Sequence, residues 1–175
     1  MLKKINSENF DAVYSIMEKS FPDNERRPYN QQKKLLERKD YSIYVIENDA
    51  GSGIKAFITV YEFETFVFVE HFAVDSRYRS QGLGSLILKE LLRIVNLPVC
   101  LEVELPDNQI AAKRIEFYKR CGFVLNLFPY SQPPITQGQT SVPMYIMSSG
   151  KALSQNEYTI VKNTLYKQVY DFSPL

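Results

Sequence analysis

Two glycines, Gly82 and Gly84, stand one residue apart between a strongly apolar segment and an amphipathic one. Residues 65–74 (TFVFVEHFAV) are almost continuously apolar, which is typical of a strand buried on both faces. Residues 83–94 carry aliphatic side chains at helical spacing. Glycine is costly inside a helix, but its conformational freedom suits the turn that begins one. The chain is therefore expected to pass here from a buried strand through a tight turn into a helix.

Such a turn is also suited to bind an anion. The first backbone N–H groups of a helix have no intrahelical partners, and the helix dipole adds partial positive charge there. Arg79 supplies a cationic fork just upstream, so the pattern reads R-x-x-G-x-G. It lacks the third glycine of the dinucleotide fingerprint and the Lys-Ser/Thr of a P-loop. The alternative is that the glycines only make a tight strand-to-helix turn.

The remaining patterns predict a single domain over residues 1–175. The expected order is β-α-α-β-β-β-α-β-α-β-β-α, with a hairpin that turns at residues 49–53. Gly122 is expected to end one helix, and Ser154 with Glu157 to form a capping box at the start of the last. The predicted fold class is α/β (α+β), with a mixed, mostly antiparallel central sheet and helices on both faces.

Composition and charge exclude several classes of partner. The chain has 21 basic and 20 acidic residues, and this near-neutral balance predicts no nucleic-acid or membrane partner. Cys100 and Cys121 have neither metal-type nor redox-type spacing, which predicts no metal site and favours a reducing, cytoplasmic location. The N-terminal segment lacks the apolar core of a signal peptide, and no apolar run reaches membrane-spanning length. A tyrosine-rich final helix is compatible with a homodimer.

A second landmark lies downstream of the glycine turn. Residues 116–123 (EFYKRCGF) place an aromatic-Tyr pair at the end of a predicted helix that stops at Gly-Phe. With Arg79, Gly82 and Gly84 one strand earlier, the sequence resembles the GNAT superfamily of acetyl-CoA-dependent N-acetyltransferases over most of its length. The resemblance implies a GNAT-like fold and transfer of the acetyl group of acetyl-CoA to a primary amine of a small molecule or peptide. The alternative is a non-catalytic CoA-binding sensor or assembly module on the same fold.

The resemblance also implies how the cofactor is held. The pyrophosphate would lie on the backbone N–H groups of the glycine turn, and the pantetheine arm would follow the preceding strand, where a backbone N–H near Phe72 would polarise the thioester carbonyl. The residues implied are Phe72, Ala73, Val74, Arg79, Ser80, Gln81, Gly82, Leu83, Gly84 and Ser85. Many relatives have an asparagine seven residues before the landmark tyrosine and an alanine four before it. Here these positions are Ala111 and Arg114, so Asn108 is the candidate replacement for the cofactor contact.

Tyr118 matches the tyrosine that, in this family, donates a proton to the departing CoA thiolate. A thiol has a pKa of roughly 8.5 and is a moderate leaving group, so a positioned phenol can assist its departure. The alternative is an ordinary core tyrosine on an amphipathic helix.

The amine must lose a proton before it attacks, because an alkylammonium has a pKa of roughly 10.4. Glu70 is the leading candidate for the base or water-positioner, on the strand face that it is expected to share with Phe72. His71, the only histidine, is expected on the opposite face and is an alternative candidate for the base, beside the interpretation that it is a structural histidine. The carboxylate pairs Glu62/Glu64 and Glu102/Glu104 remain open as alternatives.

Two loops have room to contact an acceptor, residues 21–30 and 129–143. The candidate acceptor-binding residues are Tyr29, Glu102, Tyr130 and Gln132. The basic run 31–39 (QQKKLLERK) is expected to face solvent.

Overall fold

The computed structural model describes residues 2–48, 51, 53–136 and 138–173. Most of the predicted hairpin turn at 49–53 therefore lies outside the described residues. The chain forms two compact units, residues 1–97 and 98–175.

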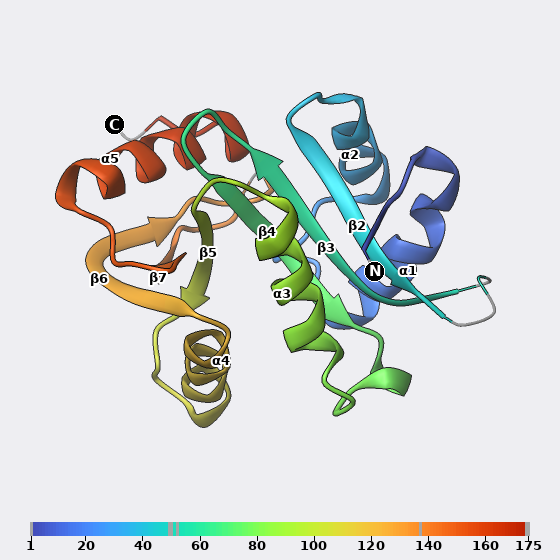
Figure 1. Ribbon diagram of the computed structural model, residues 1–175. Coiled ribbons are helices and arrows are strands. Elements are labelled where there is room, and N and C mark those ends of the chain that lie inside the picture. The colour runs from blue at the N-terminus through green and yellow to red at the C-terminus, as the bar shows by residue number, and fades with distance from the viewer. Residues whose placement is uncertain (1, 49–50, 52, 137, 174–175) are drawn as a thin grey trace. The chain divides into compact units, whose positions relative to one another are not determined.

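The first unit is a four-stranded antiparallel sheet with helices on both faces. Its strands are β1 (Lys3–Lys4), β2 (Tyr41–Glu47), β3 (Ile54–Glu62) and β4 (Val67–Val74), paired in that order. Its helices are α1 (Phe10–Ser20), α2 (Tyr29–Lys34) and α3 (Leu83–Ile94), with short 3-10 turns at Ser7–Asn9, Leu35–Glu37 and Ser76–Tyr78. Figure 1 shows α3 in front of β3 and β4 and α1 behind them, and both helices contact these two strands.

Strand β4 is interrupted by a β-bulge. Thr59 of β3 is opposite His71, but the next β3 residue, Val60, is opposite Val69, so Glu70 has no partner across the ladder. A bulge residue changes the alternation of side chains along its strand. Val67, Phe68, Val69 and Ala73 of the apolar run are buried as predicted, whereas Phe72 and Val74 are half-buried.

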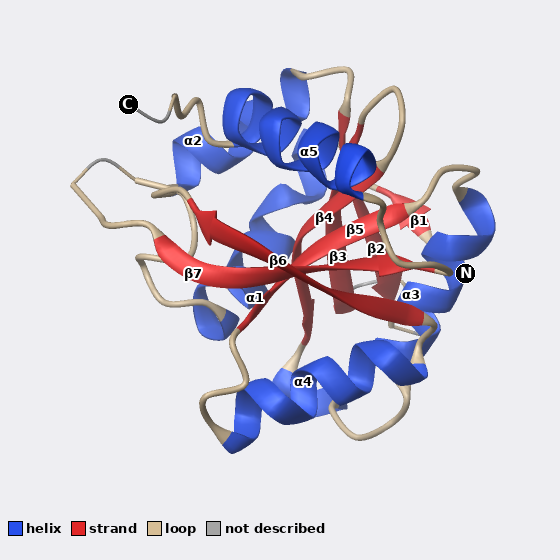
Figure 2. Cartoon of the chain, turned by 90° about the vertical axis from the view of Figure 1, so that its left-hand side faces the viewer, coloured by secondary structure: helices blue, strands red, loops and turns tan. Residues whose placement is uncertain are grey.

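The second unit is a three-stranded antiparallel sheet in which β7 lies between its neighbours. Its strands are β5 (Val99–Glu104), β6 (Phe123–Gln132) and β7 (Val142–Ser149). Its helices are α4 (Gln109–Arg120) and α5 (Gln155–Thr164), the latter continuing as a π-helical turn at Leu165–Val169. Figure 2 shows α4 below β6 and β7 and α5 above them.

Several local predictions are confirmed. Gly122 ends α4 with φ +89° and donates its N–H to the Lys119 carbonyl (3.0 Å). Ser154 and Glu157 form the predicted capping box of α5. The predicted loop 129–143 was too long, because β6 extends to Gln132 and its residues Tyr130–Gln132 pair with Met144, Pro143 and Val142 of β7. Among the described residues, no helix has both the length and the apolar character needed to cross a bilayer.

Candidate functional site

The glycine turn forms the N-terminus of α3. Gly82 is the N-cap residue with φ +76°, a left-handed conformation that favours glycine. The Leu86 N–H donates to the Gly82 carbonyl (3.0 Å), so the N–H groups of Leu83 and Gly84 precede the first bond within the helix. A Cβ at Gly82 would meet nothing within 4 Å, so the backbone conformation, and not crowding by the protein, accounts for the glycine.

The approach to this turn is shaped by Arg79 and Ser80. Arg79 Nε donates to the carbonyl of Val74 (3.2 Å), which ties the side chain back to the end of β4. This leaves further guanidinium N–H groups on an exposed side chain. Ser80 has φ +62°, one of the few non-glycine residues in the described chain with a positive φ. Ser80 is therefore strained, because a residue with a Cβ disfavours the left-handed conformation, and such strain is found at binding sites.

The predicted pantetheine-binding residues continue directly into the turn. Phe72, Ala73 and Val74 are the last residues of β4, opposite Ile58, Phe57 and Ala56 of β3. Asp75 follows and caps the 3-10 turn by accepting from the Arg77 N–H (2.9 Å). Hydrogen bonding from the Arg77 side chain lowers the pKa of Asp75 to about 2, so this cap is ionised at neutral pH.

Glu70 lies in a buried cluster rather than in an open cleft. Its side chain is 2 % exposed, and its Oε1 accepts from Arg27 Nη1 at 2.5 Å, with the Arg27 side chain 9 % exposed. Burial opposes ionisation of Glu70, but Arg27 and His71 together outweigh it and lower the pKa of this carboxyl to about 2. Sequence reasoning missed Arg27; the signal available was a basic pair in a loop predicted to be functional.

The prediction that the side chains of Glu70 and His71 lie on opposite faces of the strand is wrong. His71 Nδ1 lies 3.4 Å from Glu70 Oε2, and both residues contact the same segment, Phe21–Arg27. The reason is the bulge at Glu70, which brings two consecutive side chains to one side of β4.

Tyr118 is a buried residue of α4 with 8 % exposure. Its ring contacts those of Phe117 (5.3 Å between centroids) and Phe123 (5.9 Å). Burial raises the pKa of Tyr118 to about 12, although the positive charge of Arg114 partly opposes the shift. The phenol therefore keeps its proton at neutral pH, as a proton donor must.

The two polar residues near the start of α4 have partners of their own. Asn108 caps the helix, since its side-chain oxygen accepts from the N–H groups of Ile110 (3.0 Å) and Ala111 (2.9 Å). Arg114 Nη1 pairs with Glu104 Oε2 at 2.8 Å. Capping accounts for Asn108 without a cofactor contact.

Three of the four predicted acceptor-binding residues lie together in the second unit. Glu102 accepts hydrogen bonds from Tyr130 Oη, from Gln132 Nε2 (2.6 Å) and from Tyr170 Oη (2.6 Å). Tyr170 was not predicted, because nothing in the sequence indicates that the chain after α5 returns to β5. Burial and the neighbouring Glu102 charge raise the pKa of Tyr130 well above its usual value.

Tyr29 belongs to a separate cluster in the first unit. Its ring packs against those of Phe10 (5.3 Å) and Tyr14 (5.1 Å), and its hydroxyl donates to Asp11. This packing accounts for Tyr29 structurally.

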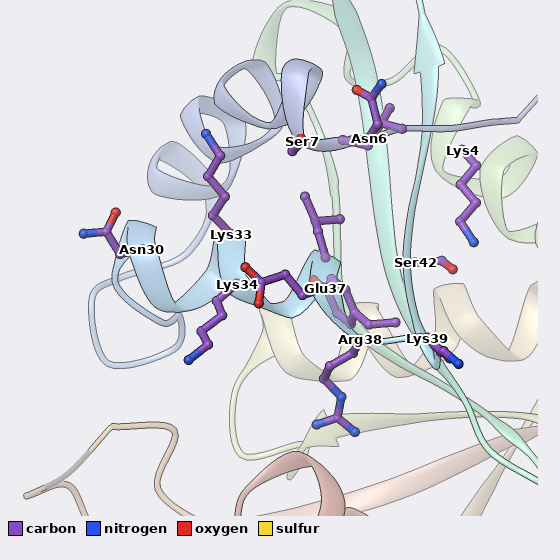
Figure 3. A pocket seen from close by; sticks show the side chains of 13 residues that line it. Lys4, Asn6, Ser7, Asn30, Lys33, Lys34, Glu37, Arg38, Lys39 and Ser42 are labelled. Carbon is purple, nitrogen blue, oxygen red and sulfur yellow. The ribbon is translucent and has the colours of Figure 1, made fainter.

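Hollows also lie on the described part of the chain, away from the glycine turn. One of about 780 Å³, between β1, β2 and the segment 30–39, is lined by much of the basic run. Figure 3 shows the ammonium groups of Lys33 and Lys34 directed away from each other and from the hollow, so these charges do not converge on one ligand. Another, of about 380 Å³, lies beside Tyr130, Tyr145 and Tyr166. Among the described residues, no group of three or more His, Cys, Asp or Glu side chains is arranged to hold a metal ion.

The buried ion pair should dominate the stability of the first unit. Removal of one partner leaves a buried charge alone, so Arg27→Met and Glu70→Gln should each lower the free energy of unfolding by about 3–5 kcal/mol. The double variant should lose less than the sum of the two, as measured by urea unfolding. The exposed pair Lys119–Glu116 is the control, with an expected coupling under about 1 kcal/mol. Additive losses at Arg27 and Glu70 would contradict the pairing.

The same carboxylate should make folding sensitive to acid. Its pKa falls from an ordinary value of 4.5 to about 2 on folding, so the stabilisation is complete above pH 4.5 and is lost as the pH falls toward 2. Glu70→Gln should therefore lose less stability than the wild type between these pH values, measured as urea midpoints. Equal losses in the two proteins would show that Glu70 does not titrate in this way.

Comparison with known proteins assigns the family. The model of the Acetyltransferase (GNAT) family matches residues 10–123, which cross the boundary between the two units. A GNAT-family structure from Bacteroides thetaiotaomicron is 30% identical, with 99% of each chain covered and a TM-score of 0.91. The YjbC protein of Bacillus subtilis (strain 168) is 27% identical over 164 residues, which are 91% of this chain and 81% of that protein.

More distant structures share the fold. The ribosomal-protein-S18-alanine N-acetyltransferase of Escherichia coli is 19% identical, with 88% of this chain and 95% of that chain covered and a TM-score of 0.62. The predicted fold class is thus confirmed. The chain belongs to the GNAT acetyltransferase family, which uses acetyl-CoA as co-substrate.

Proposed function

We propose that this protein transfers the acetyl group of acetyl-CoA directly to a primary amine of a small molecule or peptide. The observation that carries the proposal is the left-handed Gly82 at the N-terminus of α3, with Arg79 anchored beside it. That turn has the N–H donors, the conformation and the cation that a pyrophosphate requires.

The turn would hold coenzyme A through residues 79–85. Its backbone N–H groups from Gln81 to Ser85 and the remaining Arg79 N–H groups are the proposed phosphate donors. The residues from Arg79 to Gly82 are exposed, so a diphosphate can reach them from solvent. The end of β4, from Phe72 to Val74, is the proposed track of the pantetheine arm. Asn108 is not among the proposed cofactor-binding residues, because its side-chain oxygen caps α4.

Tyr118 is the proposed proton donor to the departing thiolate. A phenol with a pKa of about 12 is a poor acid toward an ordinary thiol, whose pKa is roughly 8.5. Burial changes this comparison, as Cys100 in the same unit illustrates: burial raises the pKa of its thiol to about 12. A thiolate released in a similarly dry site would match the phenol, so the proton could pass between them with little penalty.

Glu70 is too weak a base to remove the proton of the substrate ammonium group. A carboxyl with a pKa of about 2 differs from an alkylammonium by roughly eight pKa units, which corresponds to about 11 kcal/mol. We therefore propose that the acceptor reacts through the fraction of amine that is already neutral in bulk solution, its proton having gone to the solvent at ambient pH. At pH 7 this pre-equilibrium costs roughly 3.4 pKa units, or about 5 kcal/mol. Glu70 then acts by holding the segment around Arg27 against β4.

The cluster of Glu102, Tyr130 and Gln132 is the proposed recognition element for the acceptor. It places a carboxylate among polar donors, an environment that attracts a cationic amine. The identity of the acceptor is not fixed by the fold, since one fold supports many substrates. A spermidine N-acetyltransferase chimera (TM-score 0.64, 12% identity) and the alanine N-acetyltransferase named above share the fold and differ in acceptor.

Arg79→Ala should weaken the binding of coenzyme A by about tenfold, because it removes a charge-assisted contact worth about 1.5 kcal/mol or more. Isothermal titration calorimetry with coenzyme A measures the change. Arg93→Ala is the matched control, since Arg93 is exposed on the last turn of α3 and pairs with Glu90. An unchanged Kd for Arg79→Ala would remove the guanidinium from the site.

Tyr118→Phe should lower kcat by on the order of 10²-fold while the Kd for coenzyme A stays unchanged, because only the transferable proton is lost. Release of free thiol from acetyl-CoA across a panel of polyamines, amino acids, aminoglycosides and peptides is the measurement. Tyr158→Phe, which removes a phenol bonded to the Pro129 carbonyl, is the control.

The same assay separates enzyme from sensor. Coenzyme A binding without turnover of any amine in the panel would favour the non-catalytic module. Full activity of Tyr118→Phe would instead leave the enzyme in place and remove the phenol from its mechanism.

A further inference from the structure

The imidazole of His71 has one hydrogen bond that fixes the position of a proton. Its Nε2 lies 2.8 Å from the carbonyl oxygen of Glu25. A carbonyl oxygen only accepts, so Nε2 carries the proton and donates it. In a neutral ring this arrangement leaves Nδ1 with a lone pair and no hydrogen.

That lone pair faces another acceptor. Nδ1 is 3.4 Å from Oε2 of Glu70, in a contact where both side chains are almost fully buried, 3 % and 2 % exposed. Both atoms are buried without a hydrogen-bond partner in the part of the chain that the structure describes. A buried polar atom without a hydrogen-bond partner destabilises the folded state. With a neutral imidazole, two such atoms would face each other.

We infer that His71 is an imidazolium whose second proton, on Nδ1, is donated to Oε2 of Glu70. This one proton gives both atoms a partner of opposite charge, because it turns the 3.4 Å contact between two acceptors into an attractive ion pair. Glu70 then accepts from Arg27 through Oε1 and from His71 through Oε2.

Among the described residues that interact with Glu70, the remaining groups are neutral or already paired with it. Tyr41 of β2 and Tyr61 of β3 both interact with its charge, and burial together with that charge raises the pKa of each phenol, so both stay neutral. Thr59 of β3 is bonded to the backbone of His71 and carries no charge. On the loop that covers the cluster, Arg27 is the cation paired with Glu70, and it reaches the other carboxylate oxygen.

The consequence is a clamp between the loop and the strand. His71 joins the Glu25 carbonyl to β4, its ring packs edge-on against Phe21 (4.9 Å), and Glu70 holds Arg27. The loop 21–30 is one of the two segments predicted to contact the acceptor, so His71 would be a positioning residue for the reaction. That last step rests on the proposed function, whereas the protonation of His71 does not.

The protonation is directly measurable because His71 is the only histidine in the chain. A long-range ¹H–¹⁵N correlation spectrum of the ¹⁵N-labelled full chain, at a pH about one unit above the usual imidazole pKa of roughly 6.5, reports both ring nitrogens. Both should appear as N–H, although a free imidazole would be about nine-tenths neutral there. A lone pair on Nδ1 in the wild-type protein would overturn the inference without any need of a variant.

Two variants test the partner. Glu70→Gln removes the charge that holds the proton, so Nδ1 should become unprotonated at the same pH. Glu64→Gln, an exposed carboxylate near the start of β4, should leave the spectrum unchanged. An imidazolium that persists in Glu70→Gln would show that Glu70 is not its partner.

The clamp has its own readout, independent of acetyl transfer. His71→Asn should speed amide hydrogen exchange at residues 21–27 by about tenfold or more relative to wild type, while β6 and β7 exchange as before. Unchanged exchange at residues 21–27 would show that His71 does not hold the loop. Neither the spectrum nor the exchange measurement involves coenzyme A. A negative result in either would therefore contradict the inference about His71 without bearing on the proposed acetyl transfer.

Discussion

The ion pair between Arg27 and Glu70 joins two segments that the sequence separates by 43 positions. Both charges are removed from water, so neither is tolerable there without the other. The pair fixes the loop after α1 onto the middle of β4, and β4 leads directly into the turn that begins α3. Glu70 therefore stabilises the fold by pairing with Arg27. Its pKa of about 2 also makes it a weak base.

The pKa values of buried groups are shifted in opposite senses, down for Glu70 in the first unit and up for Tyr118 and Cys100 in the second. In the first unit the effect of burial is overcome by neighbouring cations, so that a carboxyl remains ionised with almost no contact with water. In the second nothing overcomes it, and the phenol of Tyr118 and the thiol of Cys100 both keep their protons far above their usual range. A dry environment that raises the pKa of donor and leaving group alike is favourable for proton transfer between them. In water the usual pKa values of a phenol (about 10) and a thiol (about 8.5) differ more than these two buried values do.

Some features of the structure could be predicted from the sequence and others could not, depending on whether they arise from neighbouring or from distant residues. The glycine turn was predictable because its requirements are local: a positive φ at Gly82 and open N–H groups depend on a few consecutive residues. The caps at Ser154 and Gly122 are local in the same sense. The faces of β4 were not predictable, because the bulge at Glu70 arises from its register with β3 and reverses the expected alternation. Tyr170 could not be predicted either, since it meets Glu102 across 68 positions.

The sequence by itself determined the family, the order of helices and strands, and the glycine turn before α3, because each follows from short-range spacing of glycine, charge and apolar residues. Tertiary structure alone decided which charges are paired and which polar atoms are buried. Arg27 rather than water faces Glu70, the histidine lies beside that carboxylate, and Asn108 caps a helix. The physical reason is that the pKa and partners of a side chain depend on desolvation and on groups brought from distant segments, neither of which is encoded in the residues adjacent to it.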